Sequence, residues 1–116
     1  MSVKKVKLTI PQGSTYVHTF SYVDSDGDAV SLLNFTARMQ FRESAAAEAA
    51  LYEGTTENGH IVINGPAGSV QLKISAATTA AWTFTYAVYD LEIVSPLGVV
   101  TRLVQGSVKV TPEVTR

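Results

Sequence analysis

The residues best suited to chemistry in this sequence are three aspartates at alternate positions, Asp24, Asp26 and Asp28. Carboxylates spaced around a glycine resemble the start of an oxygen-rich calcium loop. The acidic ligand that completes such a loop further along the chain is missing. Aspartate and glycine are also the residues that a tight turn needs, so a plain turn is the favoured interpretation and calcium is the alternative. We predict no other metal site and no cofactor.

Two histidines are the next candidates for catalysis. His18 falls on a strand with aromatic neighbours, where a packed or rim histidine is expected, and His60 follows a turn, where a solvated one is expected. No sequence motif pairs either ring with a nucleophile, and the chain has no cysteine. The residues therefore predict a binding or structural protein, and not an enzyme.

Asp90 and Glu92 form the last candidate group, because they lie two positions apart on one predicted strand. Such a pair could hold a metal or act as an acid and a base. Carboxylates on the wet face of a strand are normally solvated, and Arg102 or Lys109 on the neighbouring strand could offset their charge. We therefore expect a surface charge group here.

Composition limits the possible classes of protein. The chain has 116 residues, of which 46% are hydrophobic and 16% charged, which suits a single folded domain over residues 1–116. A formal net charge of −1 makes nucleic acid an unexpected partner. Lys4, Lys5 and Lys7 are expected to form a solvated strand edge that discourages aggregation.

Neither a signal peptide nor a membrane span is expected. No apolar run of about seven residues follows Lys4 and Lys5, and no stretch approaches the roughly 20 apolar residues that cross a bilayer. A chain without cysteine also lacks the disulfides that small secreted proteins often use. We therefore expect a soluble protein.

The strongest structural pattern is a hairpin over residues 84–110. Its first arm alternates apolar and polar residues from Ala87 to Val94, and the sequence Ser95-Pro96-Leu97-Gly98 predicts the turn. The return arm changes its apolar phase near Gln105-Gly106, which predicts a bulge there.

Other stretches predict short strands that would form sheets together with this hairpin. The expected strands cover residues 5–10, 15–23, 35–42, 51–55, 61–63 and 70–74. We expect Glu43 to Ala50 to be a surface excursion with one or two helical turns, and Asp24 to Asp28 to turn a hairpin. Ser75 is expected to cap a short helical segment, and Trp82 to plug the core.

About seven to nine short strands with no long helix predict an all-β fold, an immunoglobulin-like antiparallel β-sandwich. A helical turn before a tyrosine-bearing strand is typical of the corner between the sheets of such folds. Tyr86 and Tyr89 are the candidates for that corner.

Four motifs in order give a resemblance that spans nearly the whole chain. They are Gln12-Gly13 before a strand, Thr36 to Gln40 within a central strand, the turn Glu57 to Gly59, and Tyr89 to Glu92 at the last hairpin. The pattern resembles small tailed-bacteriophage virion proteins and the amino-terminal domains of baseplate upper proteins and tail-fibre adaptors. The resemblance implies an immunoglobulin-like sandwich that attaches to other virion proteins and catalyses nothing.

The expected function is therefore structural attachment in the tail, collar or baseplate of a virion assembled in the host cytoplasm. Its partners would be other virion proteins and further copies of itself in an oligomer or ring. The sequence ends at Arg116 without a fibre region, so an adaptor would dock a separate fibre, and capsid decoration as a cement protein stays open. A carbohydrate-binding module using Tyr16, Tyr22 and Tyr86 is the alternative from another class, ahead of an enzyme.

Overall fold

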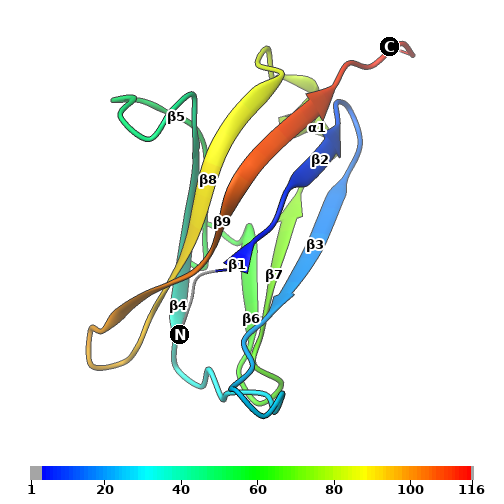
Figure 1. Cartoon of the computed structure of the whole chain (residues 1–116). Coiled ribbons are helices and arrows are strands. Elements are labelled where there is room, and N and C mark those ends of the chain that lie inside the picture. The colour runs from blue at the N-terminus through cyan, green and yellow to red at the C-terminus, as the bar shows by residue number, and fades with distance from the viewer. Residues whose placement is uncertain (1–3, 116) are drawn as a thin grey trace.

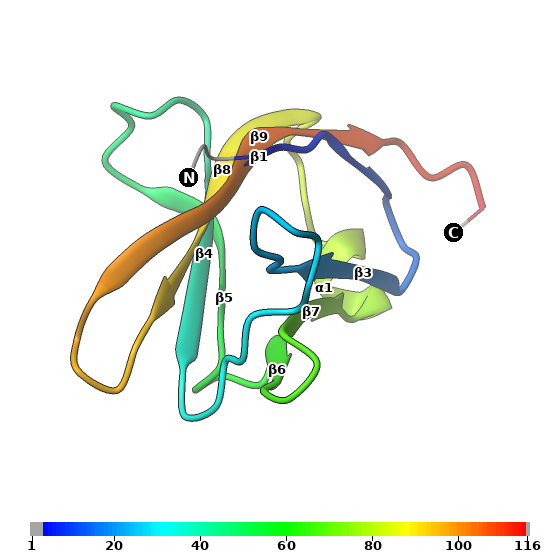
Figure 2. The same ribbon diagram turned by 60° about the horizontal axis from the view of Figure 1, so that its bottom comes forward.

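The structure is a computed structural model that describes residues 4–115, and it consists of two β-sheets that face each other (Figures 1 and 2). The larger sheet has six strands in the order β1-β9-β8-β4-β5, with β2 also paired to β9, and the smaller has three in the order β3-β7-β6. The prediction of a nearly all-β chain is confirmed. The strands of the larger sheet are β1 (Lys4–Lys5), β2 (Leu8–Pro11), β4 (Thr36–Arg42), β5 (Ala50–Thr55), β8 (Tyr86–Val94) and β9 (Val100–Thr111). The remaining elements are β3 (Tyr16–Ser21), β6 (Ile61–Asn64), β7 (Ser69–Ile74) and the short helix α1 (Ala76–Ala80).

The first predicted strand departs from expectation in two ways. It is divided into β1 and β2 around Val6, and both pieces run parallel to β9, whereas the other strand pairings within the sheets are antiparallel. The N–H of Val6 still donates to the carbonyl of Gln105 at 2.9 Å, so the interruption is a local kink beside β9. Alternation of residues predicts which faces a strand presents but not the direction of its neighbour, so the parallel pairing was missed.

The β8–β9 hairpin and its turn are confirmed. Ser95 and Val99 exchange hydrogen bonds across the turn, and the N–H of Gly98 donates to the carbonyl of Ser95 at 2.9 Å. The bulge lies a little before its predicted place: Leu91 faces Val104 and Glu92 faces Arg102, which leaves Leu103 as the extra residue. Leu103 and Val104 are consecutive and both buried, so the change of phase occurs at this pair.

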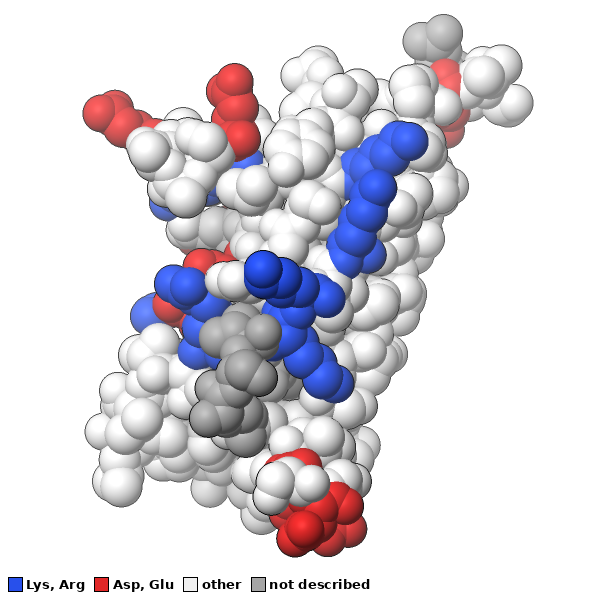
Figure 3. Space-filling view, in the orientation of Figure 1, with Lys and Arg blue, Asp and Glu red and all other residues white. Residues whose placement is uncertain are grey.

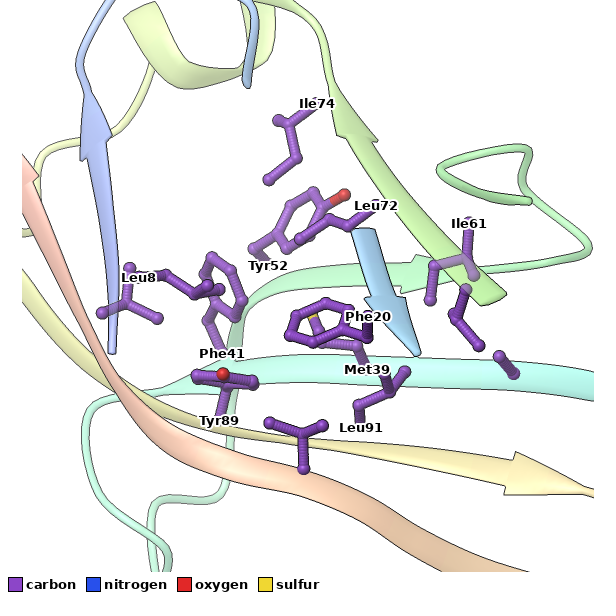
Figure 4. Packing of buried hydrophobic residues seen from close by; sticks show 14 of the residues in the cluster. Leu8, Phe20, Met39, Phe41, Tyr52, Ile61, Leu72, Ile74, Tyr89 and Leu91 are labelled. Atoms are coloured by element: carbon purple, nitrogen blue, oxygen red, sulfur yellow. The ribbon is translucent and has the colours of Figure 1, made fainter. Parts of the chain in front are cut away.

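The core lies between the sheets, and its centre is aromatic (Figure 4). Phe41 of β4 is fully buried, and its ring centroid lies 5.0 Å from Tyr52, 5.8 Å from Trp82 and 5.9 Å from Tyr89. Trp82 keeps only 8% of its surface exposed, so it closes the core as predicted. Burying side chains of this size stabilises the fold by about 1.5–3 kcal/mol each.

The aromatic residues of β3, and Tyr22 directly after it, lie toward the core. Phe20 is buried, and Tyr16 and Tyr22 pack against the core cluster from its margin. The alternate residue Val17 is half exposed on the outer side of the smaller sheet.

The two predicted helical segments have different outcomes. Ser75 caps α1 by accepting a hydrogen bond from the N–H of Thr78, which confirms the predicted cap. The segment from Glu43 to Ala50 forms turns and bends without helix, so the expected helical turns are wrong. Arg42 donates to the carbonyls of Ala47 and Glu48, and these side-chain bonds tie the segment down without a helical ladder.

Candidate interaction surface on the larger sheet

The outer face of the larger sheet gathers most of the charged side chains that the sequence singled out. Side chains alternate along a strand, so the residues between core positions on β4 and β8 point away from the core. Pairing of the strands places Gln40, Asp90 and Gln105 in one row, with Lys5 at its end. The next row holds Arg38, Glu92 and Arg102.

Arginines neutralise the carboxylate pair on this face. The Nε of Arg38 lies 2.8 Å from Oε1 of Glu92, and the Nε of Arg102 lies 3.5 Å from Oδ2 of Asp90. The prediction that Arg102 offsets the pair is confirmed, whereas Lys109 lies opposite Tyr86. Arg38 was not predicted as a partner, because the sequence does not show that β4 borders β8. Each such exposed pair contributes only about 0–1 kcal/mol, so the pairs fix orientation more than stability.

A hydrogen-bond chain continues across β4 to β5. Gln40 donates to Glu53 at 2.6 Å and accepts from the guanidinium of Arg42 at 2.6 Å. The same guanidinium holds the segment that follows β4, through the carbonyls of Ala47 and Glu48. This series of hydrogen bonds therefore joins the outer face of the larger sheet to the segment after β4, which borders that face on one side.

A groove of about 850 Å³ lies on this face, and Figure 3 shows the hollow between two projecting parts of the molecule. Its floor is the row of Gln40, Asp90 and Gln105, and Tyr86 lies among its lining residues with 57% of its surface exposed. Basic, acidic and amide groups stand side by side here, which suits recognition of a polar partner. The full lining is Lys5, Gln40, Arg42, Glu43, Ser44, Ala45, Tyr86, Val88, Tyr89, Asp90, Glu92, Arg102, Gln105 and Gly106.

Positive charge is concentrated on the same face. In Figure 3 the basic side chains gather across the middle of this face with some acidic side chains among them, and further acidic side chains stand at the ends of the molecule. Of the eight Lys and Arg residues within residues 4–115, six point outward from the larger sheet. They are Lys5, Lys7, Arg38, Arg42, Arg102 and Lys109.

The three aspartates of the candidate calcium loop form an exposed turn. Oδ1 of Asp24 accepts the N–H groups of Asp26 and Asp28 at 2.9 and 3.0 Å. Carboxylate oxygens of the three residues lie within 4.8 Å of one another. One oxygen of Asp24 thus already serves the backbone, as a plain turn requires. A single bridge between Val23 and Ala29 closes the turn, so the predicted two-strand hairpin is reduced to that bridge.

The two histidines lie away from the carboxylates of the groove. His18 on β3 packs against Phe20 with ring centroids 4.5 Å apart, as expected, and burial lowers its pKa. His60 was expected to be solvated and is half-buried, with its Nδ1 2.5 Å from the hydroxyl of Tyr52. Burial raises the pKa of Tyr52, so its hydroxyl stays protonated and can donate to His60.

The tyrosines proposed for sugar binding do not form one platform. Tyr16 and Tyr22 pack against the core from the smaller sheet, whereas Tyr86 is exposed on the outer face of the larger sheet. Of the two candidates for a corner tyrosine, Tyr89 is buried, and its hydroxyl donates to the carbonyl of Val6 at 2.7 Å. Burial, and secondarily the charge of Tyr16, raises the pKa of Tyr89, which keeps that donor protonated.

Gln12-Gly13, the first motif of the resemblance, joins distant parts of the chain. The Gln12 side chain donates to the carbonyl of Trp82 at 2.9 Å and accepts from the N–H of Glu113 at 3.0 Å. The N–H of Gly13 donates to the hydroxyl of Thr79 at 3.0 Å. The motif therefore fixes the end of β2 to α1 and to the segment after β9.

No protein-family model matches this chain, and no curated protein is significantly similar to it in sequence. Among the residues described, no helix is long and apolar enough to cross a membrane.

Proposed function

We propose that the two sheets form an immunoglobulin-like sandwich. The order β3-β7-β6 corresponds to the B, E and D strands of such a fold, and β9-β8-β4 to the G, F and C strands. The helix α1 lies between β7 and β8, where the chain crosses from one sheet to the other. The parallel position of β1 and β2 beside β9 is a variation on the constant-type strand order, in which the first strand belongs to the other sheet.

We propose that the chain is a non-enzymatic structural protein of a bacteriophage virion, which attaches to other virion proteins in the tail, collar or baseplate. The observation that carries this proposal is the groove face of the larger sheet, a broad set of interlocked charged and amide side chains. Such groups give specificity and orientation to contacts between proteins. The four motifs of the phage resemblance support the same function.

The tip of the β8–β9 hairpin offers an apolar contact in addition. The hairpin projects from the body of the molecule in Figure 1. Leu97 is 93% exposed and Val99 is 61% exposed. Apolar side chains exposed together mark contact sites between proteins. Replacing both by serine is expected to reduce incorporation into particles, whereas Val62→Ser on the smaller sheet is expected to leave it unchanged.

Particle composition tests this function. Particles of the virus that encodes the chain would be purified at low salt and analysed by mass spectrometry, and a map of the particle would place the protein. The chain is expected at a fixed copy number in the tail, collar or baseplate. A position on the capsid surface would favour decoration instead, and absence from mature particles would refute both.

Carbohydrate binding is a second candidate, because exposed Tyr86 lines the same groove as several hydrogen-bonding side chains. Aromatic faces stack on sugar rings, and neighbouring polar groups would orient the hydroxyls. A glycan array with the intact chain and with Tyr86→Ala tests it. Sugar binding that Tyr86→Ala abolishes would support this function, and no binding at millimolar sugar would exclude it.

A further inference from the structure

We propose that the groove face of the larger sheet receives the acidic turn Asp24 to Asp28 of a second copy, so that copies associate head to tail. The inference deepens the proposed function by naming the contact between copies, and it rests on that function only for its role in a virion. The charge and the position of the two surfaces point to this occupant.

The groove face carries an excess of positive charge. Its six outward cations stand against four carboxylates, Glu43, Glu53, Asp90 and Glu92, which leaves two positive charges in excess. The excess lies along β1, β2 and β9, where Lys5, Lys7 and Lys109 are exposed. Asp90 and Glu92 are engaged by arginines, whereas Lys5 and Lys7 are exposed at the edge formed by β1 and β2. The whole chain has a net charge of −1, so the rest of its surface is acidic. A face of this kind attracts an acidic surface.

The acidic turn supplies the complementary charge in a fixed shape. Asp24, Asp26 and Asp28 place three carboxylates within five residues, all of them exposed. Gly27 allows the turn with a φ of 85°, and the two hydrogen bonds to Asp24 hold the backbone in place. A preorganised turn loses little conformational entropy when it binds.

The two surfaces lie apart on the molecule, so the acidic turn of one copy cannot reach the groove face of the same copy. In Figure 3 a red cluster projects at the end of the molecule where the turn after β3 lies in Figure 1, and the basic side chains lie on the body. The groove of about 850 Å³ falls within the roughly 300–1,000 Å³ of sites that enclose compact ligands. Contact between different surfaces of identical copies is heterologous, so it repeats and forms a ring where the rotation closes.

Sedimentation velocity on the full chain tests the contact. At about 30 mM salt, where screening is weak, the sedimentation coefficient is expected to rise with concentration, and at about 500 mM salt the rise is expected to disappear. Absence of association at low salt up to millimolar protein would overturn the proposal.

Neutral variants identify the two surfaces. Asp26→Asn with Asp28→Asn removes charge from the turn but keeps Asp24, whose carboxylate holds the backbone. Lys5→Gln with Lys7→Gln removes charge from the groove face. Each double variant is expected to weaken association at least about tenfold, which corresponds to about 1.4 kcal/mol.

Control variants change charge elsewhere: two acids to match the turn variant, and one cation to compare with the two removed from the groove face. Glu48→Gln with Glu57→Gln removes two exposed acids outside the turn, and Lys73→Gln removes an exposed cation from the smaller sheet. Both controls are expected to associate as the unmodified chain does. Association that the test variants and the controls reduce equally would overturn the proposal, because net charge alone would then explain it.

A mixture of the two test variants gives the decisive result. The variant with a neutralised turn keeps its groove face, and the variant with a neutralised groove face keeps its turn. These two intact surfaces can bind each other, and no intact surface is then left for a third copy. The mixture is therefore expected to form dimers and nothing larger, whereas the unmodified chain forms longer species or rings. A mixture that stays monomeric, while the unmodified chain associates, would overturn the pairing of these surfaces. Particle composition is measured separately, so a virion protein that stays monomeric in solution refutes this inference alone.

Discussion

The hydroxyl of Tyr89 donates a 2.7 Å hydrogen bond to the carbonyl of Val6, a residue 83 positions away in the chain. Tyr89 on β8 lies opposite Gly106 on β9, and Val6 lies on the far side of Gly106. The tyrosine therefore reaches across a glycine and fixes the kink between β1 and β2. Two predictions depend on this arrangement.

Tyr89→Phe should lower the free energy of unfolding by about 1–2 kcal/mol, because the Val6 carbonyl loses its partner in a partly buried place. Urea denaturation followed by Trp82 fluorescence measures the change. Tyr86→Phe, at a position 57% exposed, serves as control and should change stability by less than about 0.5 kcal/mol. Equal stability of Tyr89→Phe and the unmodified chain would contradict the role of the bond.

Gly106→Ala should destabilise the fold more strongly than Gly98→Ala. A Cβ on Gly106 would lie 2.1 Å from the carbonyl oxygen of Val6, so the backbone of β1 and β2 must move. Gly98 has a φ of 85° but open space around it, so alanine there costs only about 1 kcal/mol of backbone strain. We expect Gly106→Ala to lower the free energy of unfolding by more than about 2 kcal/mol. Thermal unfolding of the Gly106→Ala and Gly98→Ala variants measures the difference. The reverse order would show that the kink adapts freely.

Asp24→Ala should destabilise the turn by about 1 kcal/mol, whereas Asp26→Ala should have little effect, because it is the Asp24 carboxylate that accepts the two backbone N–H groups of this turn. The melting temperature of the unmodified chain should not rise when calcium is added. A rise of several degrees that Asp26→Ala removes would instead establish the three carboxylates as a calcium site.

Trp82→Ala should cost about 3–5 kcal/mol, because the indole closes the aromatic core beside Phe41 and Tyr52. Circular dichroism follows unfolding without relying on the lost fluorophore. Val62→Ala, at a position 57% exposed, should cost less than about 0.5 kcal/mol. Similar losses at the two sites would mean that Trp82 is not part of a close-packed core.

His18 should make stability depend on pH. Burial lowers the pKa of His18 below its usual value of about 6.5, so the folded state favours the neutral ring. The unfolded chain therefore binds more protons near that pH, and stability should be full above about pH 6.5 and fall as the pH drops below it. Urea denaturation between pH 5 and 8, with His18→Phe as comparison, measures the slope. A slope that His18→Phe leaves unchanged would assign the effect to other groups.

Sequence alone predicted the elements whose signals are local. A few neighbouring residues are enough to predict each of three features: the alternation from Ala87 to Val94, the turn at Ser95 to Gly98 and the cap at Ser75. The bulge was predicted near Gln105-Gly106, close to its observed place at Leu103, because a change of apolar phase marks it within the strand itself.

Only the tertiary structure decided which strands that are distant in the sequence are neighbours, and which side chains lie together on their outer faces. The parallel place of β1 and β2 beside β9, the Arg38 to Glu92 ion pair and the bond from Tyr89 to Val6 all join residues far apart in the chain. An alternating pattern assigns each side chain to a face, but pairing between strands depends on packing over the whole core. For the same physical reason, the sequence contains the cations of the groove face but does not show that they lie together.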